Sequence, residues 1–538
     1  MKKAFIYIPL AALIGLSGCT KNFDKINTDP TKASPGNFDP NYFLSTSEWT
    51  YVDGIMGYNG AILFQSGWVQ VISSTSSGGA NYYSNADKYA PSSNTNDYLG
   101  RAWERGYRAA SHANEILKGT AGNASLVNVN SVATIMKVLE LQYVTDIYGD
   151  IPYSQAFLGG SGNSLPVYDK QQDVYNSMLT ELDAALTKMD ANKAKPTADI
   201  FNYNGDVAKW KKFGYSLMLR IAMRMTKADA AKAKTYAEKA VTGGTLAGVA
   251  DNAYVLPNNA NGYTNQNSRA LRTVEDFYSV RWSKVLIDYL KSTNDPRLSV
   301  IAEVPQAGLT NNNNIGLAGD NAAASQLGEP NGWDLNAGAT DITKSPGYPG
   351  GTGTGANLTP IGKYSRPRSS VYLDFNTPVF VLTYAETELL LAEAAARGWA
   401  AGATAAVHYR NAVSAALQSL ATFNAASATI SAATADAFAG ANPLNVTNLD
   451  ASLKMINEQY WATTGAFMNF TEAWNNWKRS GYPQLTPVNY TGNFSGGAIP
   501  RRQPYPTGES TTNGANYRAA VSAMTGGDTW NAKVWWDK

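Results

Sequence analysis

The residues best suited to chemistry in this sequence are aromatic side chains that stand close to amides. A tryptophan or tyrosine ring can pack on the flat C–H face of a sugar ring, and amide groups can bond to the sugar hydroxyls. Tyrosine (31 residues) outnumbers phenylalanine (16), and there are 13 tryptophans, so most rings carry a polar edge. The residues that best fit a sugar-binding surface are Trp68, Asn81, Tyr82, Tyr83, Trp282 and Trp333.

Each of these rings could instead fill the protein core. Core packing is an equal or better interpretation for Trp68 and Trp282, because both fall in segments with helical spacing. Tyr82, Tyr83 and Trp333 stand in polar loops, which favours a solvent-facing or ligand-facing role. Four other tryptophans lie on predicted helices and are interpreted as packing residues: Trp103, Trp210, Trp474 and Trp477.

Catalytic and metal-binding motifs are missing from the sequence. The two histidines, His112 and His408, stand far apart, each in a predicted helix and neither with metal-ligand spacing, so we interpret them as packing residues. No Gly-x-Ser-x-Gly motif occurs, and the glycine-rich stretch 347–355 matches no phosphate-binding loop. The sequence therefore predicts no metal site, no organic cofactor and no nucleophilic catalysis.

Paired carboxylates are harder to exclude, because a glycosidase needs only two of them at a set distance. Glu386 and Glu393 lie in a strongly apolar predicted helix. We interpret both as structural partners of arginines, and Glu393 and Arg397 have the spacing of an i,i+4 ion pair.

The first nineteen residues carry an export signal. Lys2 and Lys3 precede an apolar run from residue 4 to 16, and Leu16-Ser17-Gly18-Cys19 follows. This pattern is typical of bacterial lipoproteins, in which cleavage falls before the cysteine and its sulfur receives a lipid. Cys19 is also the only cysteine, so a lipid anchor is favoured over a chance cysteine after an ordinary signal peptide. The expected organisation is a signal peptide at 1–18, a tether at 19–40 and one domain at 41–538.

Charge argues against nucleic acid as a partner. Removing Lys2 and Lys3 from the 44 basic residues leaves 42, against 42 acidic residues, so the mature chain is formally neutral. Nucleic-acid binding needs clustered lysines and arginines, and no such run occurs.

The periodicity of apolar residues predicts an all-α fold with one scaffold of tetratricopeptide-like helix pairs and long irregular loops that carry the ligand face. The expected pairs are 127–148 with 171–189, 206–225 with 228–241, 379–397 with 401–420, and 450–463 with 467–478. Further helices are expected at 41–71, 98–117 and 282–290. Residues 305–365 are rich in Gly, Asn, Thr and Ala and are expected to be irregular.

Several short motifs, taken in order, resemble the SusD/RagB family of Bacteroidetes surface lipoproteins over nearly the whole chain. Besides the segment ending in Cys19, they are DIYGDIPY at 146–153, LRIAMR at 219–224, NDPRL at 294–298, YAE to AEA at 384–394, EAW to Pro at 472–483 and IPRR to YP at 499–506.

The resemblance implies a nutrient-binding outer-membrane lipoprotein that sits over a SusC-like, TonB-dependent barrel. The expected function is capture of an oligosaccharide at the cell surface and its delivery to that transporter, without cleavage. Three alternatives stay open: the same architecture binding peptides, a surface polysaccharide hydrolase, and a structural surface lipoprotein without a ligand. Only Asp24 is acidic in the five residues after Cys19, so exposure at the outer face rests on the resemblance more than on a sorting signal.

Overall fold

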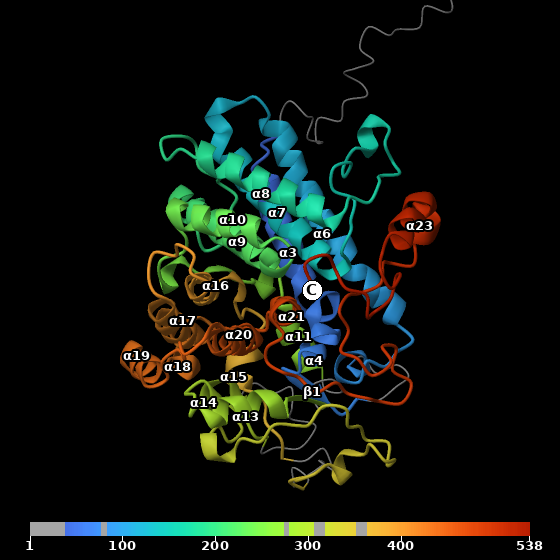
Figure 1. Cartoon of the computed structure of the whole chain (residues 1–538), viewed down its shortest axis with the longest axis vertical. Coiled ribbons are helices and arrows are strands. Elements are labelled where there is room, and N and C mark those ends of the chain that lie inside the picture. Colours follow the sequence, from blue (N-terminus) through green and yellow to red (C-terminus); the bar gives the residue numbers. More distant parts are fainter. Residues whose placement is uncertain (1–37, 77–82, 274–278, 306–317, 351–362) are drawn as a thin grey trace, which may run out of the picture. The chain divides into compact units, whose positions relative to one another are not determined.

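Long helices, many of them packed in consecutive pairs, form the scaffold of the structure (Figure 1). The computed structural model describes residues 38–76, 83–273, 279–305, 318–350 and 363–538, and residues 41–538 form one compact unit. Cys19 and the rest of segment 1–37 lie outside the described residues. The long helices are α3 (Tyr42–Ile55), α6 (Thr95–Thr120), α7 (Val127–Tyr148), α8 (Gln171–Lys188), α9 (Val207–Arg224), α10 (Ala230–Gly243), α16 (Tyr384–Ala396), α17 (Ala405–Ser419), α19 (Ala432–Ala441), α20 (Leu449–Ala466) and α21 (Phe470–Ser480).

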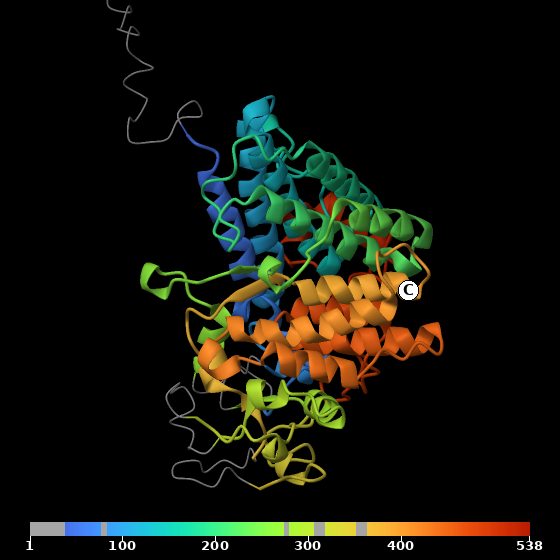
Figure 2. The same cartoon turned by 90° about the vertical axis from the view of Figure 1, so that its left-hand side faces the viewer.

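The four predicted helix pairs are confirmed, with α7 packed on α8, α9 on α10, α16 on α17, and α20 on α21. Helix α9 also packs against α8 on one side and α16 on the other, so the pairs stack (Figure 2). The sequence reasoning missed the extensive packing of α6 against both α3 and α7. The fold is the expected all-α, tetratricopeptide-like scaffold.

Helix α9 illustrates why these segments fold as they do. Trp210, Phe213 and Leu217 recur at steps of three and four residues, and all three are fully buried. The side chain of Asp206 accepts hydrogen bonds from the backbone N–H groups of residues 208 and 209 and so caps the helix. One apolar stripe and one cap thus define the helix and the face that it buries.

The start of α16 was predicted wrongly. Residues 379–382 form strand β6 (Val379–Leu382), which pairs with β2 (Ala253–Val255), instead of the first turn of the helix. The helix begins only after Thr383, whose hydroxyl accepts a hydrogen bond from the Glu386 N–H at 3.2 Å. The sequence Val-Phe-Val suits a strand, and Thr383 with Glu386 has the spacing of a capping box.

Two other predicted helices are shorter than expected. The helix expected over 41–71 ends at Ile55, and 3-10 turns and the four-residue α4 (Gln65–Trp68) follow. Gly57 has φ +52°, and a Cβ there would lie 2.6 Å from a backbone oxygen, so the chain bends where only glycine fits. Trp282 belongs to strand β3 (Val280–Trp282), and α13 (Lys284–Ser292) starts after the Ser283 cap.

The strands are short and form three two-stranded antiparallel sheets among the described residues. β1 (Ile72–Ser74) pairs with β3, β2 with β6, and β4 (Ala302–Glu303) with β5 (Arg366–Pro367). The remaining short helices are α5 (Ser84–Asp87), α11 (Gln266–Arg272), α14 (Leu298–Ile301), α15 (Ser369–Tyr372), α18 (Ala425–Ala428), α22 (Glu509–Thr512) and α23 (Gly514–Ser522).

Buried ion pairs join the helix pairs to one another. Arg220 on α9 donates to Glu386 on α16 at 2.6 and 2.9 Å. One turn further along α9, Arg224 donates to both carboxylate oxygens of Glu472 on α21 at 2.6 Å. All four side chains are almost completely buried, so each charge depends on its partner.

Glu393 is a second such centre. It accepts hydrogen bonds from Arg479 on α21 at 2.7 Å and from Arg397, one turn along the chain, at 2.8 Å. The prediction that Glu386 and Glu393 pair with arginines is confirmed, including the i,i+4 pair with Arg397.

The histidines lie in helices as predicted. The half-buried His112 on α6 stacks on Phe43 with ring centroids 5.9 Å apart. His408 on α17 is buried between Glu388 and the Ala401 carbonyl, each 2.9 Å from a ring nitrogen. Both therefore act in packing. In the described part of the chain, no helix combines the length and the apolar character that crossing a bilayer requires.

Candidate functional site

The segments that carry the predicted ligand residues come together at one end of the molecule. Strand β1 pairs with β3 so that Ile72 stands opposite Trp282. Helix α5, which follows the segment with Asn81 and Tyr82, packs against β1. Figure 1 shows the yellow part of the chain, which includes Trp333, at the same end below β1. The predicted ligand residues therefore belong to neighbouring segments, although their side chains differ in burial.

Residues 330–334, here called the strap, are fastened to this region by hydrogen bonds. Asn331 donates through its side-chain amide to the carbonyl of Ile72 at 2.8 Å. The backbone N–H of Gly332 donates to the carboxylate of Asp87, on α5, at 3.0 Å. The strap thus lies across β1 and α5, and it presents Trp333 directly after these two anchoring residues.

Three of the predicted ligand residues are core residues instead. Trp68, Tyr83 and Trp282 each have 0% exposed surface. The indole N–H of Trp68 donates to the Asn85 carbonyl, and that of Trp282 to the Ile301 carbonyl, both at 2.9 Å. The ligand-facing prediction is therefore wrong for these three. A large ring beside short elements is readily buried, and the indole N–H of each tryptophan finds a backbone partner there.

Trp333 is the predicted ring that fits a surface role. All thirteen tryptophans lie in the described part of the chain; seven are core residues and five more are half-buried against that core. Trp333 is half-buried and, alone among the thirteen, belongs to neither group. Asn81 and Tyr82 lie outside the described residues, and their predicted role stays a prediction.

A second half-buried ring, Tyr490, lies next to the strap. Its hydroxyl donates to the carboxylate of Asp334, the residue after Trp333, at 2.7 Å. The chain around Tyr490 also packs closely on the strap, because a Cβ at Gly332 would lie 2.6 Å from the Val488 side chain. Gly332 has φ +88°, so both its backbone and its surroundings require glycine.

Asp334 is the electrostatic centre of this arrangement. Burial raises the pKa of Asp334, but hydrogen bonds from the Tyr490 hydroxyl, the Asn336 N–H and the Thr340 hydroxyl outweigh burial and hold the pKa below its ordinary value. Burial and the hydrogen bond to Asp334 raise the pKa of Tyr490 to about 12, so its hydroxyl remains a donor at neutral pH. The buried carboxylate thus fixes the positions of Tyr490 and of the strap.

Buried charges lie beneath the strap. Lys88 and Asp87 form an ion pair at 2.8 Å, and both are buried. Burial raises the pKa of Glu329 to about 8, although the positive charge of Arg281 partly offsets this effect. Glu329 has 0% exposed surface, so no ligand at the surface can reach its carboxyl group. This cluster therefore supports the strap and is unsuited to acid–base catalysis on a bound ligand.

Known proteins resemble this chain over most of its length. Residues 37–506 match a family described as "Starch-binding associating with outer membrane". The chain belongs to the SusD-like family. No curated protein sequence matches it.

Solved SusD-like structures share this fold. A chitin-binding protein is 30% identical, with a TM-score of 0.76, and the match covers 93% of this chain and 100% of that protein. A Bacteroidetes SusD-like protein is 24% identical, with a TM-score of 0.75 and the same coverage. A chitin-binding SusD homologue from Flavobacterium johnsoniae is 22% identical, with a TM-score of 0.71 over 92% of this chain and 98% of its own.

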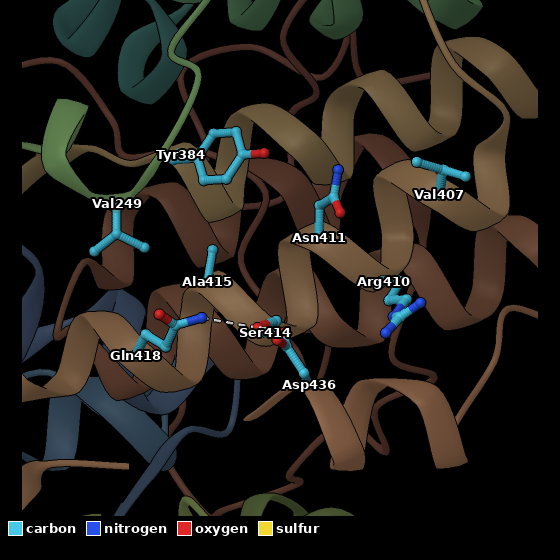
Figure 3. Close-up of a pocket in the computed structure, with 9 residues that line it drawn as sticks. All are labelled: Val249, Tyr384, Val407, Arg410, Asn411, Ser414, Ala415, Gln418 and Asp436. Atoms are coloured by element: carbon cyan, nitrogen blue, oxygen red, sulfur yellow. Dashed lines mark hydrogen bonds between the residues drawn. The ribbon is translucent and has the colours of Figure 1, made fainter. Parts of the chain in front are cut away.

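This SusD-like chain also has a polar pocket of about 390 Å³ on α17 (Figure 3). It is lined by Val249, Tyr384, Val407, Arg410, Asn411, Ser414, Ala415, Gln418 and Asp436. Several of its polar groups bond to one another: Gln418 donates to Ser414 at 2.9 Å, and Ser414 donates to Asp436 at 2.5 Å. Tyr384 is the one aromatic ring among these lining residues, so the pocket offers a ligand less stacking surface than the strap region.

Tyr490, which lies in a turn-rich segment near the end of the chain, was not singled out from the sequence. A signal was present, because Tyr490 stands between Asn489 and the Thr-Gly-Asn of 491–493, much as Asn81 precedes two tyrosines. In this SusD-like fold, Tyr490 contacts the strap, which precedes it by more than 150 residues in the sequence. The sequence alone could not show this contact.

Proposed function

We propose that this protein is a cell-surface receptor that captures an oligosaccharide without cleaving it and delivers it to a SusC-like, TonB-dependent transporter. The observation that carries the proposal is the half-buried Trp333 on the strap, next to Tyr490 and outside the packed core. Two half-buried rings with hydroxyl and amide groups nearby suit the C–H faces and the hydroxyls of a sugar.

The comparisons support a glycan as the ligand. The matched family is described as starch-binding, and the 30%-identical structure is named a chitin-binding protein. We therefore take chito-oligosaccharides and malto-oligosaccharides as the first ligands to test. No catalytic role is proposed, because the paired glutamates on α16 are bound to arginines and Glu329 is closed to the surface.

Attachment to the membrane is proposed to occur through a lipid on Cys19, after removal of residues 1–18. Residues 19–40 then serve as a tether for the folded part. The family description places its members in association with the outer membrane, which supports this location. Family membership supports the proposed barrel partner and the proposed orientation toward the cell exterior.

The ligand site is tested by calorimetric titration of the wild type and of Trp333→Ala with both sugar series. We expect the variant to bind the preferred sugar at least 10-fold more weakly, a loss of about 1.4 kcal/mol. Trp399→Ala is the matched control, because Trp399 is also half-buried but packs on the core. Equal affinity of wild type and Trp333→Ala, with the fold intact, would remove the strap from the site.

A further inference from the structure

Two aromatic cavities lie on either side of the short helix α22. The first has a volume of about 460 Å³ and is bounded by the start of α6, by Phe494 and Trp530, and by Tyr517 on α23. The rings of Phe494 and Trp530 are stacked, with centroids 3.9 Å apart and planes inclined by 17°. Trp530 in turn contacts the buried Trp68 at 5.7 Å, so its position is fixed by the core.

Polar groups stand beside these rings in the first cavity. Asp528 accepts hydrogen bonds from the Tyr517 hydroxyl at 3.0 Å and from Arg502 at 2.6 Å. Because Arg502 balances the charge of Asp528, this acid suits a neutral ligand better than a cationic one. Asn96 and Ser510 add an amide and a hydroxyl to the lining.

The second cavity has a volume of about 340 Å³ and is lined by Trp103, Tyr107 and Phe157, with Glu509 and Asn513 on its other wall. The Trp103 and Tyr107 centroids are 4.9 Å apart. Phe157 has φ +65°, a left-handed conformation that side chains rarely adopt, so the surrounding structure holds this ring in place at a conformational cost. Figure 1 shows α23 beside the teal loop that contains this residue.

The two cavities share a wall. The ring of Tyr505, which lines the first cavity, contacts Trp103 of the second at 5.8 Å and Tyr517 of the first at 6.0 Å. On α22, Ser510 faces the first cavity and Glu509 the second. The rings thus follow one another across the surface.

The first cavity is also close to the strap. Phe494 follows Tyr490 by four residues, which span at most about 14 Å of chain. The Phe494 N–H donates to the Tyr89 carbonyl at 2.8 Å, and Tyr89 lies two residues after Asp87, which anchors the strap. A chain-like ligand leaving Trp333 and Tyr490 can therefore continue past Phe494 into both cavities.

We propose that these two cavities are extension subsites for a neutral oligosaccharide whose first sugars bind at the strap, an inference that rests on the proposed function. Aromatic rings, amides, hydroxyls and the charge-balanced Asp528 match successive sugar units, each with two C–H faces and a rim of hydroxyls. The receptor is thereby selective for long oligosaccharides, because each added sugar unit can stack on aromatic rings in the first cavity and then in the second.

The test measures affinity against chain length by calorimetry, with chito-oligosaccharides and malto-oligosaccharides of two to six units. For the wild type, affinity rises with length. Tyr517→Ala and Phe157→Gly each lower the affinity for the six-unit ligand at least 10-fold and leave that for the two-unit ligand unchanged. Glycine at 157 removes the ring while suiting the left-handed backbone, and Tyr517→Phe, which keeps the ring, retains most of the affinity.

Tyr236→Ala, a half-buried tyrosine on α10, is the matched control and leaves both affinities unchanged. Folding of every variant is checked by its thermal unfolding. If Trp333→Ala weakens all lengths but Tyr517→Ala and Phe157→Gly change none, the extension subsites are wrong and the proposed function stands. If the wild type binds no oligosaccharide of any length, both fail.

Discussion

Replacing Glu393 by glutamine removes one charge from the buried network that joins the helix pairs. Glu393 on α16 is 1% exposed and accepts hydrogen bonds from Arg479 on α21 and from Arg397. Glutamine keeps the shape of the side chain but leaves the guanidinium of Arg479 buried without its counter-charge. The change therefore tests how strongly α16 and α21 depend on this pairing.

The expected magnitude follows from the pKa of Glu393. Burial raises that pKa, but the Arg479 and Arg397 guanidinium groups outweigh burial and lower it from 4.5 to about 2. This lowering of the pKa corresponds to a contribution of roughly 3 kcal/mol to the free energy of unfolding at pH 7. Removing one partner of a buried ion pair typically costs about 3–5 kcal/mol, which agrees with this contribution.

The sign of the pH dependence is also fixed. Because the folded-state pKa is depressed, this contribution is complete above pH 4.5 and is lost as the pH falls toward 2. Urea unfolding free energies of wild type and Glu393→Gln should differ by roughly 3 kcal/mol at pH 7 and by roughly 1 kcal/mol at pH 3. Glu104→Gln, which breaks an exposed pair with Arg108, should cost less than about 0.5 kcal/mol. A loss below 1 kcal/mol for Glu393→Gln at pH 7, or one independent of pH, would refute this reasoning.

Two further predictions concern the buried Glu329 beneath the strap and the membrane anchor at Cys19. The pKa of Glu329 is raised from 4.5 to about 8. Between these two pH values the folded protein holds a proton that the unfolded chain has lost. The free energy of unfolding therefore falls as the pH rises from 4.5 to 8, by up to about 1.4 kcal/mol per pH unit. Glu329→Gln should match the wild type in thermal unfolding below pH 4.5 and be the more stable of the two at pH 8; a wild type as stable as the variant at pH 8 would contradict a raised pKa. Cys19→Ser should move the protein from the membrane fraction to the soluble fraction in cell fractionation, and unchanged membrane retention would argue against the lipid anchor.

Much of the scaffold could be predicted because long amphipathic helices are specified locally. The regular spacing of Trp210, Phe213 and Leu217 fixes α9 whatever its neighbours are. The start of α16 could not be placed in the same way, because Val379–Leu382 is apolar enough for either a helix or a strand. Its pairing with β2, more than 120 residues earlier, decides between the two.

The candidate site was predicted at the level of regions. Loop composition singled out the polar segment around Trp333, whose ring is half-buried and outside the core clusters, and its ligand-facing role stays a prediction. The same reasoning was wrong for Tyr83, because a polar loop can still return one ring to the core. Tyr490 and the rings beside α22 were missed, since their relation to the strap depends on how the last sixty residues fold back over α6.

The central claim is that this chain binds an oligosaccharide, through the face that carries Trp333, without cleaving it. The most direct measurement is a calorimetric titration of the purified protein with oligosaccharides and with peptides of similar length, followed by chromatography of the recovered ligand. The account predicts saturable binding of an oligosaccharide that is recovered at its original length, and no binding of the peptides. Saturable binding of peptides alone, or recovery of shortened sugars, would contradict it.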